Sequence, residues 1–258
     1  MPKRLQKDDS SATDTYAKFV AVPFETGYGH TIGNSLRRIL LSSIEGAAIS
    51  AVTIEGVQHE FQPIEGVVED VTEIVLNLKK VRIRTEANKR EAFKGSIDVN
   101  KTGVIKASDI KFETKGAAVS LVNPDQVICT LDNKRSFEAE IEIKTGRGYY
   151  PGEQNKKEEQ AIGVIPIDSL FSPVTKVNYT VEATRLGQRI DYDKLTLEVT
   201  TDGSILPNDA VSMSAKILRD HFSLLISFDE EPQQEEEAAV DEDIVRKRKM
   251  LDKSVEEL

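Results

Sequence analysis

A glycine-punctuated stretch from Gly27 to Gly46 places the strongest constraint on how this chain can fold. It reads Gly-Tyr-Gly-His-Thr-Ile-Gly-Asn-Ser-Leu-Arg-Arg-Ile-Leu-Leu-Ser-Ser-Ile-Glu-Gly, a turn followed by an apolar-periodic segment. The hydroxyl of Thr31 could accept hydrogen bonds from the unpaired N–H groups of a first helical turn, and Gly46 suits a left-handed C-cap. The stretch therefore predicts a helix from about Ile32 to Glu45.

The predicted helix has two unlike faces. At roughly 100° per residue, one line of the helix collects residues suited to burial, namely Ile32, Leu36, Ile39 and Ser43, widened by Leu40 and Ile44. The opposite side holds Asn34, Arg38 and Leu41, with Ser35 and Ser42 nearby. A leucine between small polar residues and an arginine is consistent with contact to a second partner. Because scattered exposed leucines are normal, an ordinary surface helix explains the same pattern.

Length and composition bound the class of protein. A chain of 258 residues with 39% hydrophobic content can bury a core, and one or two domains are expected. No run of about 18 apolar residues and no basic-then-apolar leader occurs, so we expect neither a membrane span nor a secretory signal. These features predict a cytoplasmic location.

The acidic balance of the chain has a local origin. Nine of its 44 acidic residues lie between positions 229 and 243, where no basic residue occurs, and the rest of the chain is close to neutral. No block of lysine and arginine with interleaved aromatic residues is present to follow a phosphate backbone. Direct binding of nucleic acid by the folded part is therefore not expected.

The cysteine and the histidines give no sign of metal or redox chemistry. Cys129 is the single cysteine, and its apolar flanks predict a buried strand thiol rather than a nucleophile. The three histidines, His30, His59 and His221, lack the pairwise spacing of a zinc site. No metal and no cofactor are expected on this chain.

The remaining patterns predict an α+β fold. Residues 65–80 carry apolar residues at helical spacing, with acids first and lysines last, which predicts a helix. A second helix is predicted from Pro207 to Ile226, and its apolar stripe is broad enough to pack against more than one neighbouring element. Short strands are expected at 17–24, 47–57, 81–85, 93–99, 117–122, 126–131, 137–143, 162–167, 174–183 and around 195–199. Residues 146–151 read as a turn and 152–160 as a polar surface loop.

The glycine turn also raises the hypothesis of a nucleotide site. Glycines between a strand and a helix allow a backbone to approach a pyrophosphate, but Gly33 falls one residue late for the G-x-G-x-x-G pattern. A tight structural turn explains the glycines better, and a nucleotide-binding enzyme is kept as an alternative. The acid pairs Glu69-Asp70 and Asp191 with Asp193 have no nucleophile or metal beside them and are interpreted as structural. A partner contact around 191–194 is a further option.

Four separated stretches resemble one protein family. Residues 24–43 are similar to the first helix of the bacterial (or plastid) RNA polymerase alpha subunit, and residues 65–80, 146–149 and 181–195 also resemble that family. The resemblance spans Phe19 to about Ile226. It implies a non-catalytic subunit of a nucleotidyltransferase complex, DNA-directed RNA polymerase. An unrelated oligomeric adaptor with the same layout of sheets and helices is a second alternative.

The resemblance implies a discontinuous dimerisation subdomain with two long helices, into which a β-rich subdomain is inserted. The expected boundaries are a flexible arm at 1–16, the dimerisation subdomain at 17–46 and 167–228, the inserted subdomain at 47–166, and an acidic linker at 229–249. Residues 250–258 resemble only the first residues of the family's C-terminal domain, which binds promoter DNA and activators. Contact with promoter DNA is expected through that domain alone.

The resemblance also implies the partners. In the family, the two long helices pack against those of a second copy, and the homodimer is the platform for the beta and beta-prime subunits. The implied dimer residues are Ile32, Leu36, Ile39, Leu218, Phe222 and Leu225. The implied beta contact is Arg38 and Leu41, with Asn34, Gly33 and His30 shaping the same surface. For beta-prime, the implied residues are Arg185, Arg189 and Lys194.

Overall fold

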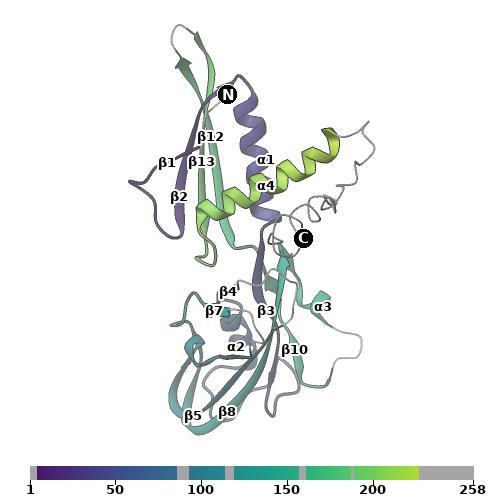
Figure 1. Ribbon diagram of the computed structural model, residues 1–258. Coiled ribbons are helices and arrows are strands. Elements are labelled where there is room, and N and C mark those ends of the chain that lie inside the picture. The colour runs from purple at the N-terminus through teal and green to yellow at the C-terminus, as the bar shows by residue number, and fades with distance from the viewer. Residues whose placement is uncertain (1–4, 86–92, 114–118, 157–160, 187–188, 227–258) are drawn as a thin grey trace, which may run out of the picture. The chain divides into compact units, whose positions relative to one another are not determined.

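Two large antiparallel sheets, one two-stranded sheet and four α-helices make up the computed structural model, which describes residues 5–85, 93–113, 119–156, 161–186 and 189–226 (Figure 1). Residues 1–218 form one compact unit, and a second unit begins at Arg219. The mixed, mostly antiparallel architecture confirms the predicted α+β class. The predicted subdomain boundaries stay predictions.

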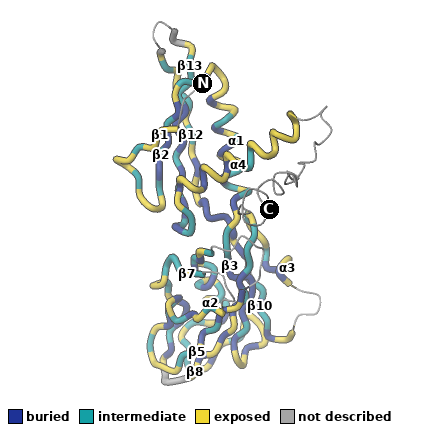
Figure 2. Tube along the Cα trace, viewed as in Figure 1, coloured by how far each residue is buried: buried dark blue, intermediate teal, exposed yellow. Residues whose placement is uncertain are grey.

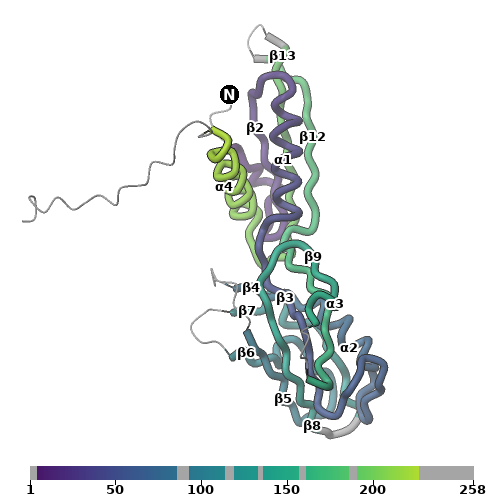
Figure 3. Tube along the Cα trace, turned by 90° about the vertical axis from the view of Figure 1, so that its right-hand side faces the viewer, coloured from purple at the N-terminus to yellow at the C-terminus, as the bar shows by residue number. Residues whose placement is uncertain are grey.

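The first sheet joins the beginning and the end of the chain. Its four strands lie in the order β1 (Gln6–Lys7), β2 (Tyr16–Glu25), β13 (Arg189–Thr201) and β12 (Val174–Leu186), and every pair is antiparallel. Helix α1 (Tyr28–Ser42) runs along β12, as Figure 3 shows, and α4 (Pro207–Ile226) follows β13. Leu36 and Leu40 of α1 share a buried cluster with Leu197, Val199 and Val211.

The second sheet is built from the middle of the chain. Its path is β6 (Lys111–Glu113), β5 (Phe93–Lys106), β8 (Val127–Arg147), β3 (Glu45–Ile54), β4 (Ile83–Thr85) and β7 (Val119–Leu121), and β10 (Val164–Pro166) also pairs with β3. Helix α2 (Val71–Leu78) supplies Val71, Ile74 and Leu78 to the core of this sheet. The short 3₁₀ helix η1 (Ala107–Asp109) follows β5.

A small third element lies between the two sheets in the sequence. Strands β9 (Tyr149–Tyr150) and β11 (Ser169–Leu170) pair with each other, and the single-turn helix α3 (Gly152–Asn155) follows β9. Gly148 has a φ of 66°, which places the turn between β8 and β9 in the left-handed region that glycine favours. The predicted turn at 146–151 is thus centred on Gly148, and the start of the predicted polar loop is helical instead.

Both predicted ends of the first helix are wrong. Helix α1 begins at Tyr28, four residues earlier than Ile32, because its N-cap is Gly27 with a φ of 91°. Thr31 lies within the first turn, where its hydroxyl donates to the Gly27 carbonyl at 3.2 Å. The C-cap is Ser43, and Gly46 belongs to β3, where an added Cβ would collide with the Phe171 carbonyl.

Two further elements differ from their predictions. Helix α2 begins only at Val71, because Asp70 caps it by accepting a hydrogen bond from the Glu73 N–H at 2.7 Å. The sequence predicts two strands, at 126–131 and 137–143, but β8 continues through the polar residues between them. Strand β8 pairs with β5 on both sides of these polar residues. Figure 2 shows burial concentrated on the sheets, whereas the last turns of α4 are exposed.

Candidate protein-binding surfaces

The N-terminus of α1 is fixed by a carboxylate from the sheet beneath it. Oδ2 of Asp193 accepts hydrogen bonds from the N–H groups of Gly27 at 2.8 Å and Gly29 at 3.3 Å. The Thr26 hydroxyl donates to the Asp191 carbonyl at 2.8 Å. An acidic side chain at this position satisfies unpaired N–H groups and complements the helix dipole. The structural interpretation of the Asp191 and Asp193 pair therefore agrees with these bonds.

Two glycines allow α1 to lie directly on the sheet. A Cβ built on Gly29 would come to 2.9 Å from Val181, and one built on Gly33 would come to 2.8 Å from both Leu195 and Tyr179. Both glycines are buried, and the buried face continues through Leu36 and Leu40. The glycines are thus explained by close packing, and Asp193 already fills the helix N-terminus where a nucleotide phosphate would have to bind.

The buried line of α1 is rotated from the predicted one. It runs through Gly29, Gly33, Leu36 and Leu40, whereas Ile32 and Ile39 are only half-buried on its flank. The prediction missed this rotation because it gave the glycines no weight as packing residues. Gly33 was expected to shape an exposed surface for beta, but its burial leaves it no surface to offer.

The opposite face of α1 is open to solvent. Thr31, Asn34 and Arg38 are exposed, and Leu41 is half-buried. The Arg38 side chain makes no hydrogen bond or ion pair with the residues that the structure describes. Its neighbour Arg37 differs, because Nε of Arg37 donates to the Val177 carbonyl at 3.3 Å. Of the two arginines, Arg38 is therefore the one available for a planar, bidentate contact to a partner.

His30 lies one turn before Asn34 on the same exposed side. Its ring meets the Tyr179 ring edge-on, with 6.2 Å between the ring centroids. On a helix, His30, Asn34, Arg38 and Leu41 follow one another at spacings of three and four residues and so share a face. The structure therefore places four of the five predicted beta-contact residues together. We call these four residues the Arg38 surface.

Helix α4 changes character along its length. Ala210, Val211 and Ser214 are buried against the first sheet. From Arg219 to Ile226 every residue is exposed, and four of them are large and apolar: Phe222 at 53%, Leu224 at 75%, Leu225 at 68% and Ile226 at 83%. Exposed apolar side chains concentrated in the last turns of a helix indicate a surface that another polypeptide covers. We call these four residues the α4 apolar patch.

The predicted dimer residues fall into two groups. Phe222 and Leu225 belong to the α4 apolar patch, and Leu218 is half-buried just before it. Leu36 is only 9% exposed because it packs in the core beneath α1, so it has little surface left for a second copy. Ile32 and Ile39 each keep part of their surface exposed.

The residues predicted for beta-prime come from one hairpin, β12–β13. Arg185 is exposed near the end of β12, and Nζ of Lys194 pairs with Oε2 of Glu182 at 2.8 Å across the two strands. The hydrogen bond and charge of Lys194 hold the pKa of Glu182 below its ordinary value. Arg189 begins β13, but its side chain lies outside the described residues.

The remaining chemical candidates are structural. Cys129 is buried in β8, and desolvation, aided by the charge of Glu69, raises the pKa of its thiol to about 12. Within the described ranges, no group of three or more His, Cys, Asp and Glu side chains could hold a metal ion. No helix in the described part of the chain combines the length and apolar composition needed to cross a membrane.

Comparison with known proteins identifies the family. Residues 52–172 match the family model of the RNA polymerase Rpb3/RpoA insert domain. The chain is 50% identical over 257 residues to the DNA-directed RNA polymerase subunit alpha of Geobacter metallireducens, covering all of this chain and 74% of that protein. It is 51% identical over 235 residues to the subunit of the same name from Leptospira biflexa, covering 91% of this chain and 71% of the relative.

A third relative of that name, from Moorella thermoacetica, is 50% identical over 245 residues, which cover 95% of this chain and 76% of the relative. The fold and these similarities define the class of an RNA polymerase subunit that is not itself catalytic. The chain belongs to the DNA-directed RNA polymerase alpha subunit family. None of these relatives supports the alternatives of a nucleotide-binding enzyme or an unrelated adaptor.

Proposed function

We propose that this chain forms a homodimer through the α4 apolar patch and that the dimer assembles the beta and beta-prime subunits of DNA-directed RNA polymerase. The observation that carries the dimer is the exposure of Phe222, Leu224, Leu225 and Ile226 at the end of an otherwise amphipathic helix. Burying one such side chain contributes about 1.5–3 kcal/mol. Two copies of the patch facing each other would therefore supply a stable interface.

The proposed contact with beta is the Arg38 surface. Arg38 is exposed and its guanidinium is free of partners among the described residues, whereas Leu41 is half-buried and also packs against the core cluster beneath α1. The proposed contact with beta-prime is the β12–β13 hairpin, where Arg185 and Lys194 lie and Arg189 begins the second strand. The two surfaces come from different elements, so identical chains in a dimer could serve different partners.

Three further parts of the proposal follow from family membership. Contact with promoter DNA and activators would be made through a C-terminal domain. Residues 250–258, which lie outside the described residues, resemble the first residues of that domain. The chain itself would hold no cofactor. The assembly would act in the cytoplasm, where DNA-templated transcription takes place in bacteria.

The experiment that tests the beta contact uses Arg38→Ala. Size-exclusion chromatography with light scattering would measure the mass of the chain alone and after mixing with purified beta. We expect the variant to remain a dimer and to lose beta, because the substitution removes an exposed charged group and no intrachain contact. Lys111→Ala is the control, since Lys111 is also an exposed cation but lies on β6. Wild-type capture of beta by Arg38→Ala would refute the assignment.

A further inference from the structure

A hollow of about 330 Å³ lies beside the end of β8, on the side of the small β9–β11 element. Its walls come from the last residues of β8, from Tyr150 of β9, from α3, and from Phe171 after β11. The Tyr150 and Phe171 rings meet edge-on with 5.7 Å between their centroids and form an aromatic wall.

The far wall of the hollow is held by buried polar groups. Nδ2 of Asn155 donates to the Ile167 carbonyl at 2.8 Å and to Oγ of Ser169 at 3.0 Å, while the Ser169 hydroxyl donates to the Ile49 carbonyl at 2.9 Å. Asn155 is 8% exposed and Ser169 is fully buried. These bonds fix α3 against β3, so the hollow is a preformed feature of the fold.

A second anchor acts at the start of α3. Oδ1 of Asp168 accepts a hydrogen bond from the Gly152 N–H at 2.7 Å, and its Oδ2 pairs with Nζ of Lys79 at 2.8 Å. The Lys79 side chain and the Gly152 N–H hold the pKa of Asp168 below its ordinary value. The carboxylate therefore ties the loop that carries Tyr150 and Gln154 to the end of α2.

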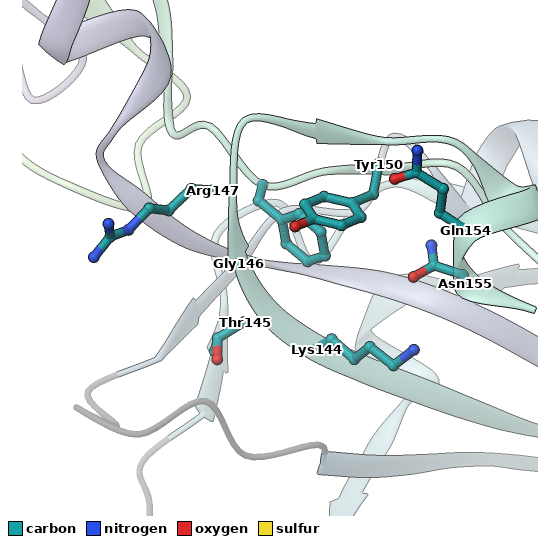
Figure 4. Close-up of a pocket in the computed structure, with 8 residues that line it drawn as sticks. Lys144, Thr145, Gly146, Arg147, Tyr150, Gln154 and Asn155 are labelled. Carbon is teal, nitrogen blue, oxygen red and sulfur yellow. The ribbon is translucent and has the colours of Figure 1, made fainter. Parts of the chain in front are cut away.

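The polar groups at the mouth have an unbalanced charge. Figure 4 shows the side chains of Lys144, Gln154 and Asn155 around one end of the hollow with Tyr150 above, whereas the Arg147 guanidinium points away from it. Arg147 is already paired with Glu45 at 2.7 Å. The Lys144 ammonium has no carboxylate within 4.0 Å among the described residues.

The next acid on the same face of β8 does not offset Lys144. That acid is Glu142, two residues before Lys144 on the same strand, and it forms no ion pair with Lys144 within 4.0 Å. The hollow therefore combines one cation, the amide of the exposed Gln154 and an aromatic wall, whereas both amide hydrogens of Asn155 are already used within the protein. This set of groups is complementary to a carboxylate on a short aliphatic stem, which is the side chain of aspartate or glutamate.

The hollow is continuous with the C-terminal end of α1. The Ser172 hydroxyl, one residue after Phe171, donates to the Leu41 carbonyl at 3.3 Å. The ion pair between Arg147 and Glu45 joins the end of β8 to the first residue of β3, which follows closely after α1. A polypeptide that covers the Arg38 surface as far as Leu41 would thus reach this region next.

We propose that the hollow receives an aspartate or glutamate side chain from a segment of the beta subunit, with Lys144 pairing its carboxylate. This inference rests on the proposed assembly with beta and adds a second contact point to it. The exposed ring of Tyr150 flanks the segment, in keeping with the enrichment of tyrosine at protein interfaces.

The test measures the affinity of the full-length homodimer for purified beta at low salt. Lys144→Glu should weaken binding roughly tenfold, because it places two carboxylates face to face, whereas Lys144→Arg should bind like the wild type. The loss should shrink as the salt concentration rises, because ions screen exposed charges. Lys94→Glu is the matched control, since Lys94 lies on the neighbouring strand β5 outside the hollow.

A photo-crosslinking residue in place of the exposed Gln154 identifies the occupant. We expect it to capture a beta peptide that contains an aspartate or glutamate, and capture of a segment without either would overturn the proposal.

If Lys144→Glu binds beta like the wild type while Arg38→Ala does not, the hollow has no role and the proposed assembly stands. If neither variant weakens binding, both fail. Protection of Lys144 from acetylation by inorganic phosphate alone would indicate a small-anion site instead.

Discussion

At the scale of single residues, the position of α1 depends on two glycines, which have no side chain. Gly29 and Gly33 let the helix backbone approach Val181, Leu195 and Tyr179 more closely than any other residue would allow. Gly27 plays a different part, because its φ of 91° is a backbone requirement and an added Cβ would meet nothing within 4 Å. The three glycines therefore contribute through different physical effects.

Alanine substitutions separate these effects. Gly33→Ala should lower the free energy of unfolding by about 1–3 kcal/mol, because Leu195 and Tyr179 must shift to admit the new methyl group. Gly27→Ala should lower it by about 1–2 kcal/mol through left-handed backbone strain alone. Urea unfolding followed by circular dichroism would measure both. An unchanged midpoint for Gly33→Ala would show that the helix does not lie as close to the sheet as described.

Asp168 gives a prediction about pH. Its pKa is held below the ordinary value of 3.8 by Lys79 and the Gly152 N–H. A lowered folded-state pKa stabilises the fold above the ordinary value, and this stabilisation disappears as the pH falls through the lower, folded-state pKa. Asp168→Asn should therefore be less stable than the wild type at pH 7, with the difference closing in strong acid. A constant difference from pH 7 to pH 2 would contradict this account.

At the scale of elements, α1 and α4 each divide their surface between the core and solvent. Leu36 is committed to the core of its own chain, whereas Phe222 lies in the exposed end of α4. Periodicity predicted both helices and the start of the second at Pro207, because apolar residues recur at helical spacing. Periodicity could not distinguish an apolar residue that packs within the chain from one that is exposed on its surface.

Charged substitutions in the two helices should have opposite effects. Phe222→Asp should convert the dimer to a folded monomer, because it places a charge in the α4 apolar patch without touching the core. Leu36→Asp should unfold the chain, since losing a buried leucine alone costs about 2–5 kcal/mol and a charge adds to that. Light scattering and circular dichroism together distinguish these outcomes.

Lys216→Asp, on an exposed position of α4, controls for the added charge on the helix. It should leave both the mass and the melting temperature of the dimer close to wild type. A dimeric Phe222→Asp, or a folded monomeric Leu36→Asp, would show that the two residues have exchanged roles.

The ends of the elements were harder to predict than their existence, and particular residues explain why. The start of α1 is set by Asp193, which lies more than 160 residues away in the sequence, so no local signal could reveal it. Strand β8 continues through polar residues because β5 pairs with it on the way. Of the candidate surfaces, the Arg38 surface was predicted from resemblance and helical spacing, whereas the hollow beside Lys144 brings together residues from four segments without any motif.

At the scale of the whole molecule, the chain is organised so that α1 connects the first sheet to the second. Helix α1 packs on β12 and β13, and within three residues of its end the chain enters β3 of the second sheet. The guanidinium of Arg84, in β4 of the second sheet, donates to the carbonyls of Gly203 and Ser204, which lie between β13 and α4. Helix α1, which carries the Arg38 surface, is itself anchored by Asp193 at its start and by the Ser172 hydroxyl, which donates to the Leu41 carbonyl, near its end.

We propose that dimerisation and capture of beta use separate surfaces of one chain, and native mass spectrometry of mixtures with purified beta would distinguish the two. The wild type should give a complex of two copies with one beta, and Arg38→Ala should give only the free dimer. Phe222→Asp should give no complex that contains two copies. A complex of two copies with beta formed by Arg38→Ala as readily as by the wild type would contradict the account.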